Sequence, residues 1–202
     1  MSVNLLKGEQ RSEEYLAVNP LGGVPALQDG DFIAGQSLAI INYLEKKVPN
    51  PSLWLDNSQN QALAEQVAFS IAEDIHPLIN LKTQKYLAEH LGADEAAKKA
   101  WYAHWTMGGM QAVERILERH GRAGDFALGD KVSIADICLV PNMYSMRRFG
   151  MDLSSFPLCL RIERHCVQLP AFQKAAPEMQ PDAPDGLEQI HGPNAPFLKD
   201  AA

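Results

Sequence analysis

The sequence predicts an α+β protein of two domains, in which a small mixed domain precedes a larger all-helical domain. Three observations support this prediction. Residues 25–44 combine two short apolar runs with a stretch of helical spacing. Residues 48–52, Val-Pro-Asn-Pro-Ser, contain two prolines that interrupt regular structure. From residue 58 onward, apolar side chains recur every three to four positions, as in helices packed into a bundle.

The predicted boundaries are residues 1–48 for the mixed domain, 49–57 for a linker, 58–176 for the helical domain and 177–202 for a proline-rich tail. The tail contains five prolines and few large apolar groups. We therefore expect it to wrap the surface or to be disordered.

In the mixed domain, Ser2–Leu6 has a β-type composition and Glu13–Val18 fits one or two helical turns. Two apolar runs flank Asp29-Gly30, a pair that a tight hairpin turn prefers because it tolerates positive φ. Apolar residues at helical spacing then continue to about Lys47, with Ser37 at the N-cap or in the first turn. The predicted order of this half is β-α-β-β-α.

The first long helix of the second domain begins at Ser58, which forms a candidate capping box with Gln61. Pro77 is expected to kink this helix or to end its first half. The buried stripe of the helix is predicted to comprise Leu63, Val67, Ile71, Ile75 and Leu78.

A second long helix is predicted over Glu95–Glu118. It contains Gly108-Gly109, which lowers helix propensity, and close packing of another helix is the expected compensation. Its inward residues are predicted to be Trp101, Trp105, Ala112, Val113 and Ile116.

A third helix is predicted over Ser133–Arg148, with Ser133 as N-cap and Asp136 completing the Asp variant of a capping box. Pro141 lies inside this helix and should bend it. Shorter helices are expected at Phe156–Val167 and Ala171–Ala175.

The composition excludes several classes of function. Of the 202 residues, 46% are hydrophobic, which is enough to bury a core. A net charge of −7 and a pI near 5.3 argue against nucleic acid or an anionic membrane as the main partner. Because there is no 18-residue apolar run and no signal-peptide pattern, we expect a cytoplasmic protein. The three cysteines lack metal-ligand spacing, so we expect reduced thiols and no metal site.

The stretch that begins at Gln36-Ser37 is predicted to form a carboxylate site. A helix N-terminus presents unpaired backbone N–H groups and a partial positive charge, and both favour an anion. The Gln36 amide and the Ser37 hydroxyl would lie beside that anion. Val24-Pro25, a candidate for a cis peptide bond, leaves main-chain groups that can pair with an extended peptide. Together these features suit a small peptide with a free α-carboxylate.

Two stretches resemble the zeta class of cytosolic glutathione transferases, which includes maleylacetoacetate isomerase and maleylpyruvate isomerases. They are NPLGGVPAL with QSLAIINYLE in the first half, and Ser-Ile-Ala-Asp (133–136) with Cys-Leu-Val-Pro (138–141) in the second. The resemblance covers residues 3–184. It implies a thioredoxin-like domain, an all-α glutathione transferase C-terminal domain, glutathione as cofactor, a small-molecule substrate and a homodimer.

The resemblance also implies a set of glutathione-binding residues. Gln36 and Ser37 correspond to the pair that holds the γ-glutamyl carboxylate. The backbone of Val24, ahead of Pro25, corresponds to the part that pairs with the cysteinyl group. Gln10 matches a glutamine that contacts glutathione. The alternatives are an ordinary helix cap for Gln36 and Ser37, and a solvated loop residue for Gln10.

On the substrate side, Arg148 matches an arginine that binds the substrate carboxylate, and a guanidinium group grips a carboxylate through two parallel bonds. The alternative for Arg148 is a cation favoured by the dipole at the end of a helix. Asn80 has the family residue type in the region that lines the cleft. His76 stands where glutamine is common, and a structural role is its alternative. Arg147 is expected to be solvated.

The family's thiolate-stabilising motif is a Ser-Ser-Cys-type turn at the start of its first helix. It has no match in the 202 residues, because neither Ser2 nor Ser12 fits it, so we assign no catalytic residue. The chain begins inside what resembles the family's second strand, which a truncated chain, a misplaced start at Met1 and a degenerate relative would each explain. Without a thiolate stabiliser, this chain is expected to bind glutathione weakly and to turn over slowly.

The activity implied by the resemblance is glutathione-dependent cis-trans isomerisation of maleylacetoacetate to fumarylacetoacetate, or of a similar maleyl dicarbonyl such as maleylpyruvate. Such a step belongs to the catabolism of tyrosine or other aromatic compounds. In the family, the glutathione thiolate adds to the cis double bond, and rotation followed by elimination gives the fumaryl isomer. Two alternatives stay open: a general glutathione S-transferase, and a non-catalytic module that keeps the fold for binding or dimerisation.

Overall fold

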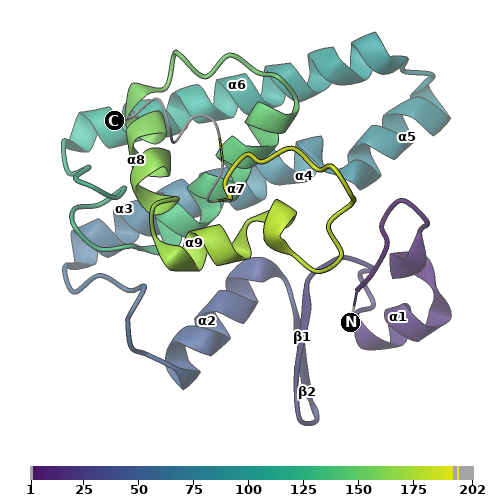
Figure 1. Ribbon diagram of the computed structural model, residues 1–202, viewed down its shortest axis with the longest axis horizontal. Coiled ribbons are helices and arrows are strands. Elements are labelled where there is room, and N and C mark those ends of the chain that lie inside the picture. The colour runs from purple at the N-terminus through teal and green to yellow at the C-terminus, as the bar shows by residue number, and fades with distance from the viewer. Residues whose placement is uncertain (1, 193–194, 196–202) are drawn as a thin grey trace. The chain divides into compact units, whose positions relative to one another are not determined.

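The structure is a computed structural model that describes residues 2–192 and residue 195 (Figure 1). The chain divides into two compact units, Met1–Leu53 and Trp54–Ala202. The first unit contains both helices and strands, and the described part of the second is built from helices joined by loops. The predicted α+β class is therefore confirmed.

The first unit is organised around a β-hairpin followed by a helix. Its elements are η1 (Glu9–Arg11), α1 (Glu13–Val18), β1 (Ala26–Asp29), β2 (Phe32–Gly35) and α2 (Ser37–Lys47). The two strands pair antiparallel, from Ala26↔Gly35 to Asp29↔Phe32. The loop residues are therefore Gly30 and Asp31, one position later than expected, and Gly30 takes the positive φ of 60°. The predicted hairpin and helix are confirmed.

The N-terminal run Ser2–Leu6 does not form the predicted strand; it is irregular up to Asn4 and then enters a turn. The Asn4 side-chain oxygen accepts hydrogen bonds from the backbone N–H groups of Leu6 and Lys7, each 3.1 Å long. Such a side-chain turn competes with strand formation. In the described part of the chain, the only ladder joins β1 to β2, so the turn prevails over the β-type composition.

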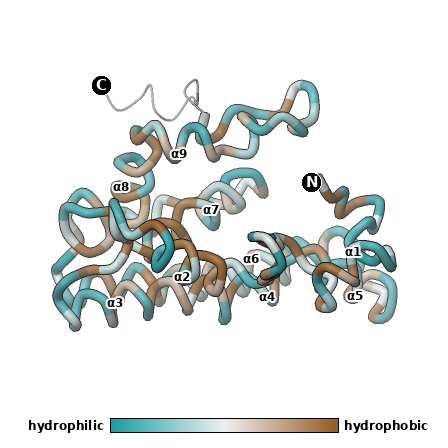
Figure 2. The backbone as a smooth tube through the Cα atoms, turned by 90° about the horizontal axis from the view of Figure 1, so that it is seen from below, coloured by the Kyte–Doolittle hydropathy of each residue, from teal (hydrophilic) through white to brown (hydrophobic). Residues whose placement is uncertain are grey.

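The second unit is a helical bundle in which α3 packs on α7, while α6 packs on η2, α4 and α8. Its elements are α3 (Ser58–Phe69), η2 (Ser70–Ile75), α4 (His76–Ile79), α5 (Leu81–Leu91), α6 (Glu95–His120), α7 (Ile134–Arg148), α8 (Pro157–Cys166), α9 (Pro170–Ala175) and η3 (Pro177–Met179). The predicted helices at the positions of α6, α7, α8 and α9 are confirmed. Apolar and polar residues alternate along α3, as the brown and teal segments of Figure 2 show.

The break expected at Pro77 is present, and it begins with a turn of π-helix. The π turn η2 precedes α4, which carries Pro77 in its first turn. A π turn inserts one extra residue into the helical repeat. The buried stripe therefore passes from Ile75 to Ile79, and Leu78, predicted to be buried, is only half-buried.

The glycine pair in α6 is confirmed as a site of close packing at one of its two positions. A Cβ atom built on Gly109 would lie 2.4 Å from Cγ1 of Ile75, whereas a Cβ on Gly108 meets nothing within 4 Å. The prediction that Trp105 and Ala112 point inward is wrong, because both are exposed. The buried face of α6 instead follows Tyr102, Thr106, Met110, Val113 and Leu117.

The two predicted helix caps in this unit have different outcomes. Helix α3 is capped by Asn57, whose side chain accepts hydrogen bonds from the N–H groups of Gln59 and Asn60, and not by Ser58. Asparagine is among the strongest N-cap residues, which explains the shift by one position. At α7, the predicted capping box of Ser133 and Asp136 is confirmed.

The C-terminal tail is exposed or half-buried over residues 177–189, as expected of a segment that wraps the surface. Its end differs from that expectation, because Ile190 and His191 are buried. Residues 193–194 and 196–202 of the predicted tail lie outside the described residues. No helix in the described part of the chain has the length and apolarity needed to cross a bilayer.

Candidate functional site

The N-terminus of α2 is not closed by a side chain. Gln36 occupies the N-cap with φ 69° and ψ 117°, and its side chain makes no capping hydrogen bond. A non-glycine residue in this conformation is strained, and such strain concentrates at binding sites. Gln36 and Ser37 are both exposed, so the N–H groups of the first helical turn face an accessible surface. This is the geometry that binds a carboxylate.

The turn before the hairpin is held by two side chains that converge on one carbonyl group. The Tyr15 hydroxyl and the Asn19 amide each donate a hydrogen bond to the Gly23 oxygen, and both bonds are 2.7 Å long. The next peptide bond, Val24–Pro25, is cis, as the sequence suggested. Among the described residues, the main-chain N–H and C=O of Val24 have no hydrogen-bond partner. The turn therefore presents a fixed, unpaired main-chain edge.

The hairpin register brings this edge next to the start of α2. Because Ala26 pairs with Gly35, Pro25 and Gln36 lie at the same open end of the ladder. The Asn19 side chain lies so close to Gly35 that a Cβ there would be 3.1 Å from Asn19 Nδ2. The side chain that holds the turn thus also contacts the residue before Gln36.

Gln10 also belongs to the first unit and lies close to the turn before the hairpin. A Cβ on Gly22 would lie 2.9 Å from the Gln10 carbonyl oxygen, so the two backbones are in close approach. The Gln10 side-chain oxygen Oε1 is buried and has no hydrogen-bond partner. All five predicted glutathione-binding residues thus lie in the first unit: Gln10 near the turn at Gly22, and Val24, Pro25, Gln36 and Ser37 at the open end of the hairpin.

The three predicted substrate-binding residues lie on three elements of the second unit. Arg148 is the last residue of α7 and is exposed. Asn80 caps α5, where its Oδ1 atom accepts a 3.2 Å hydrogen bond from the Thr83 N–H. His76 is exposed at the start of α4, directly after the π turn. No hydrogen bond or ion pair among the described residues joins the three side chains.

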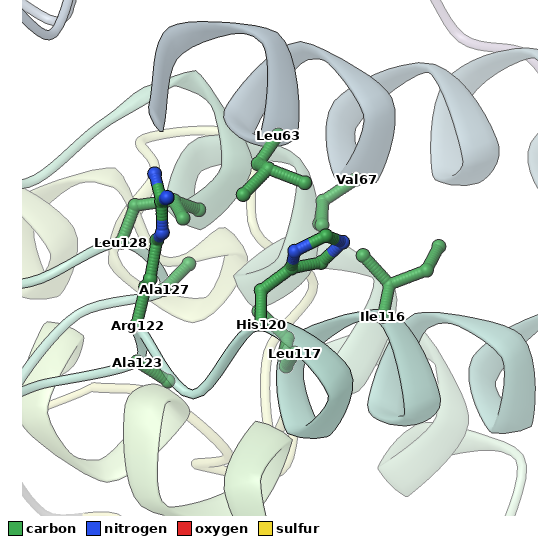
Figure 3. A pocket seen from close by; sticks show the side chains of 9 residues that line it. All are labelled: Leu63, Val67, Ile116, Leu117, His120, Arg122, Ala123, Ala127 and Leu128. Atoms are coloured by element: carbon green, nitrogen blue, oxygen red, sulfur yellow. The ribbon is translucent and has the colours of Figure 1, made fainter. Parts of the chain in front are cut away.

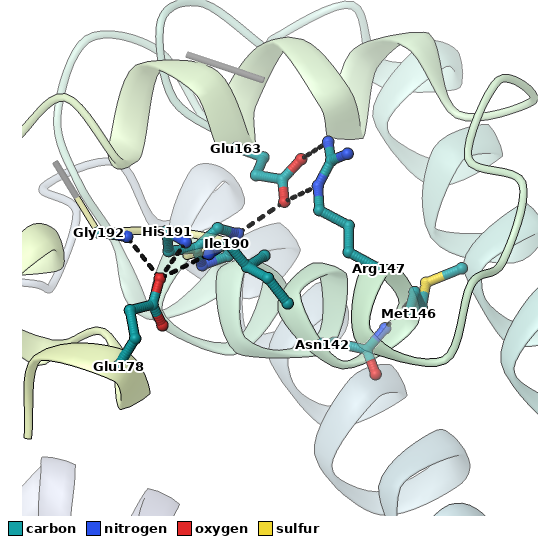
Figure 4. Close-up of polar contacts among 8 residues, drawn as sticks. All are labelled: Asn142, Met146, Arg147, Glu163, Glu178, Ile190, His191 and Gly192. Atoms are coloured by element: carbon teal, nitrogen blue, oxygen red, sulfur yellow. Dashed lines mark hydrogen bonds and ion pairs between the residues drawn. The ribbon is translucent and has the colours of Figure 1, made fainter. Parts of the chain in front are cut away.

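Arg147, predicted to be solvated, is instead an anchored and mostly buried residue (Figure 4). Its Nε and Nη2 atoms donate to the two carboxylate oxygens of Glu163, over 2.9 and 2.5 Å. The third partner is His191 of the tail, whose Nε2 lies 2.8 Å from Glu163 Oε1. Burial would raise the pKa of the Glu163 carboxyl, but the hydrogen bonds from Arg147 and His191 outweigh it and hold that pKa below its usual value.

Two pockets of the second unit contain none of the predicted site residues. One is a small apolar pocket between α3 and α6, beside the imidazole of His120 (Figure 3). The other is a shallow groove along α8. Within the described residues, no group of three or more histidine, cysteine or acidic side chains could hold a metal ion.

Sequence patterns missed four anchoring residues: Tyr15 and Asn19, which hold the turn before the hairpin, and Glu163 and His191, which hold Arg147 directly and indirectly. Asn19 directly precedes Pro20, which marks a turn but does not indicate the target of its amide. The ion pair of Arg147 with Glu163 spans 16 residues, beyond the reach of any local pattern.

Comparison with known proteins agrees with this geometry. Residues 1–52 match the family model of the glutathione S-transferase N-terminal domain. A probable maleylacetoacetate isomerase from Vibrio cholerae is 42% identical over 176 residues, which are 87% of this chain and 81% of the relative. A maleylpyruvate isomerase from a Ralstonia species is 38% identical over 183 residues, 91% of this chain and 86% of the relative.

Solved structures give the same result. The holo structure of a maleylpyruvate isomerase, a bacterial zeta-class glutathione S-transferase, has a TM-score of 0.88 and 38% identity, and covers 91% of this chain and 87% of that one. A maleylacetoacetate isomerase from Methylobacterium extorquens, solved with malonate and glutathione, has a TM-score of 0.86 and 34% identity. The match covers 91% of this chain and 86% of that one. The chain therefore belongs to the zeta-class glutathione transferase and maleylacetoacetate isomerase family.

Proposed function

We propose that this protein is a glutathione-dependent cis-trans isomerase of maleylacetoacetate, or of a similar maleyl dicarbonyl such as maleylpyruvate. The observation that carries the proposal is the open N-terminus of α2 beside the unpaired main chain of Val24. It occurs in a chain whose relatives include a maleylacetoacetate isomerase and a maleylpyruvate isomerase.

Glutathione fits the site in the first unit. The backbone N–H groups at the start of α2, the Ser37 hydroxyl and the Gln36 amide hold the γ-glutamyl carboxylate. Val24 pairs through its main chain with the cysteinyl part, as an extended peptide pairs with a strand edge. Gln10, whose side-chain oxygen Oε1 is buried without a hydrogen-bond partner, is the further glutathione-binding residue in this proposal. When bound, glutathione supplies the thiol nucleophile of the reaction.

The substrate is an acid, and Arg148 is the residue of the second unit that suits it best. Its side chain is exposed, whereas its neighbour Arg147 is committed to Glu163. A guanidinium group can bind a carboxylate through two parallel hydrogen bonds. Asn80 and His76 are the further substrate-binding residues in this proposal, and for Asn80 the Nδ2 group is the one that its capping bond leaves available.

The wider assignments are also proposals. Residues 1–48 form the glutathione-binding domain and residues 58–176 the substrate domain, with 49–57 between them. The protein acts as a homodimer in the cytoplasm, in the catabolism of tyrosine or of another aromatic compound.

A direct assay tests the proposed function. The full-length protein is incubated with maleylacetoacetate or maleylpyruvate, with and without glutathione, and the fumaryl product is measured. We expect isomerisation only when glutathione is present, and at a slow rate, because the 202 residues contain no match to the family's thiolate-stabilising turn. Glutathione binding without turnover of either acid would contradict the proposal and favour a non-catalytic binding module.

The role of Arg148 is tested by Arg148→Lys. Lysine cannot form the paired bonds, so the KM for the maleyl substrate should rise about tenfold, the loss of roughly one charge-assisted hydrogen bond. The KM for glutathione should not change. Arg119→Lys is the matched control, because Arg119 is an exposed arginine in the last turn of α6. Equal kinetic constants for Arg148→Lys and the wild type would remove Arg148 from the site.

A further inference from the structure

The C-terminal segment 186–192 is attached to the second unit at two carboxylates. The first is Glu163 of α8, which is fully buried and receives the His191 ring nitrogen at 2.8 Å. The same imidazole ring makes a T-shaped contact with the ring of Tyr144 of α7, with ring centroids 5.2 Å apart. This contact holds the tail at one place on the second unit. Without His191, the buried Glu163 carboxylate would lose one of its hydrogen-bond partners, which costs free energy.

The second carboxylate is Glu178, which lies in η3, the last helical turn before the segment. Its Oε1 atom accepts hydrogen bonds from three consecutive backbone N–H groups, those of Ile190, His191 and Gly192, at 2.8, 2.5 and 2.6 Å (Figure 4). A Cβ at Gly192 would lie 2.6 Å from Gln189 Oε1, so the Gln189 side chain would have to move to admit it. The segment is thus closed into a loop that fixes the position of the His191 ring.

Glu163 connects this segment to the end of α7. The carboxylate holds the Arg147 guanidinium through two bonds, and Arg147 directly precedes Arg148 in the last helical turn. Fixing Arg147 sets the rotation of that turn, and hence the direction in which Arg148 leaves the helix. Glu163 also compensates the repulsion between two adjacent positive charges, which would otherwise loosen the turn.

We propose that segment 186–192 is a latch that positions Arg148 for substrate, acting through His191, Glu163 and Arg147. The positioning role rests on the proposed function of Arg148, whereas the latch itself rests on the contacts above. His191 and Glu163 are positioning residues in this proposal, since neither touches the substrate.

Two substitutions open the latch at different points. His191→Ala removes the ring that reaches Glu163, and Glu178→Ala releases the loop without touching Glu163. His191→Gln keeps a hydrogen-bond donor near the position of Nε2 and is the conservative rescue. His165→Ala, which changes a half-exposed histidine of α8, is the matched control.

Kinetics and hydrogen exchange are measured on the full-length variants. For His191→Ala and Glu178→Ala, the KM for maleylpyruvate should rise about tenfold, as expected when a binding group is displaced, while the KM for glutathione stays within about twofold. His191→Gln should recover most of the wild-type value. Amide exchange in residues 144–150 should speed up in both alanine variants and remain unchanged in His165→Ala.

The outcomes separate the latch from the proposed function. Faster exchange in residues 144–150 with the expected KM split supports the proposal in full. Unchanged amide exchange in both alanine variants overturns the latch. Equal rises in the KM for glutathione and the KM for maleylpyruvate overturn the positioning role. If the wild type does not isomerise either acid, the proposed function and the positioning role both fail, and exchange alone decides whether the latch exists.

Discussion

Helices α2 and α7 begin in opposite ways. At α7 the N-terminus is closed by the protein itself: the Ser133 N–H and hydroxyl both donate to the Asp136 carboxylate, at 2.8 Å. The other oxygen of Asp136 accepts the Ala127 N–H, also at 2.8 Å, and both Ser133 and Asp136 are fully buried. At α2 the N-cap is an exposed, strained Gln36 whose side chain caps nothing.

Every helix N-terminus needs acceptors for its first N–H groups and favours a negative charge there. Helix α7 satisfies this need with an internal carboxylate, which makes the terminus a structural element of the core. Helix α2 leaves the same need to be met from outside, which makes it a binding site for the carboxylate of a ligand. The comparison teaches that an open helix N-terminus indicates a site only when the chain has not supplied its own cap.

The largest effect is expected from Asp136→Ala, which tests whether this carboxylate closes the N-terminus of α7. The substitution leaves three buried donors without their acceptor, and each such loss costs about 1–3 kcal/mol, so the free energy of unfolding should fall by about 3 kcal/mol or more. Urea unfolding measures it. Asp152→Ala is the control, because the hydrogen bonds that Asp152 accepts from Ser154 are exposed. If both variants lose a similar, small amount of the free energy of unfolding, Asp136 is not the cap that holds α7.

At the open terminus, the substitution to test is Ser37→Ala. We expect the dissociation constant for glutathione to rise about tenfold, because one hydrogen bond to a charged group is lost. The free energy of unfolding should stay within about 0.5 kcal/mol, since the hydroxyl is exposed.

Isothermal titration with glutathione and urea unfolding measure the two quantities. Ser58→Ala is the matched control, because Ser58 is also the first residue of a helix, but one that Asn57 already caps. If Ser58→Ala weakens glutathione binding as much as Ser37→Ala does, the open terminus of α2 is not the binding site.

Short-range signals in the sequence predicted the elements on which both termini depend. Asp29-Gly30 marked the hairpin, Ser133 with Asp136 marked the cap of α7, and Gly109 marked the close contact with Ile75. In each case the cause lies within a few residues of the signal, or in a backbone requirement that only a few residue types satisfy.

The errors arose where the decisive partner is distant or where the helical repeat changes. The π turn at Ser70–Ile75 moved the buried stripe by one residue, and no apolar period announces such an insertion. Arg147 appeared solvated because Glu163 and His191, its direct and indirect partners, are 16 and 44 residues further along the chain. The φ of Gln36 could not be predicted either, because a left-handed non-glycine residue is imposed by tertiary structure.

A smaller effect is expected from Ser133→Ala, which removes one half of the capping box. Asp136 still accepts the backbone N–H groups of residues 127 and 133, so only the serine hydroxyl is lost. The free energy of unfolding should fall by about 1 kcal/mol, and at most about 2 kcal/mol, in urea unfolding. Glutathione affinity should remain at the wild-type value, which separates this closed terminus from the open one. No loss of stability would count against Ser133 as a cap.

The smallest effect, and the one of opposite sign, is expected from Gln36→Gly. Glutamine at φ 69° and ψ 117° is strained by about 1–3 kcal/mol, and glycine relieves this strain. The greater freedom of glycine in the unfolded chain offsets about 0.5–1 kcal/mol, so the variant should gain about 0.5 kcal/mol in the free energy of unfolding.

The same variant should bind glutathione more weakly, because the Gln36 amide no longer lies beside the ligand carboxylate. A gain in stability with a loss of affinity is the pattern of a residue kept strained for binding. Gly23→Ala, at a position without positive φ and with nothing within 4 Å of the added Cβ, is the control: it should gain about 0.4–1 kcal/mol in the free energy of unfolding and leave glutathione affinity unchanged. A Gln36→Gly protein that loses stability while binding glutathione at full strength would show that Gln36 serves the fold, as Ser133 does, and that the contrast between the two termini is mistaken.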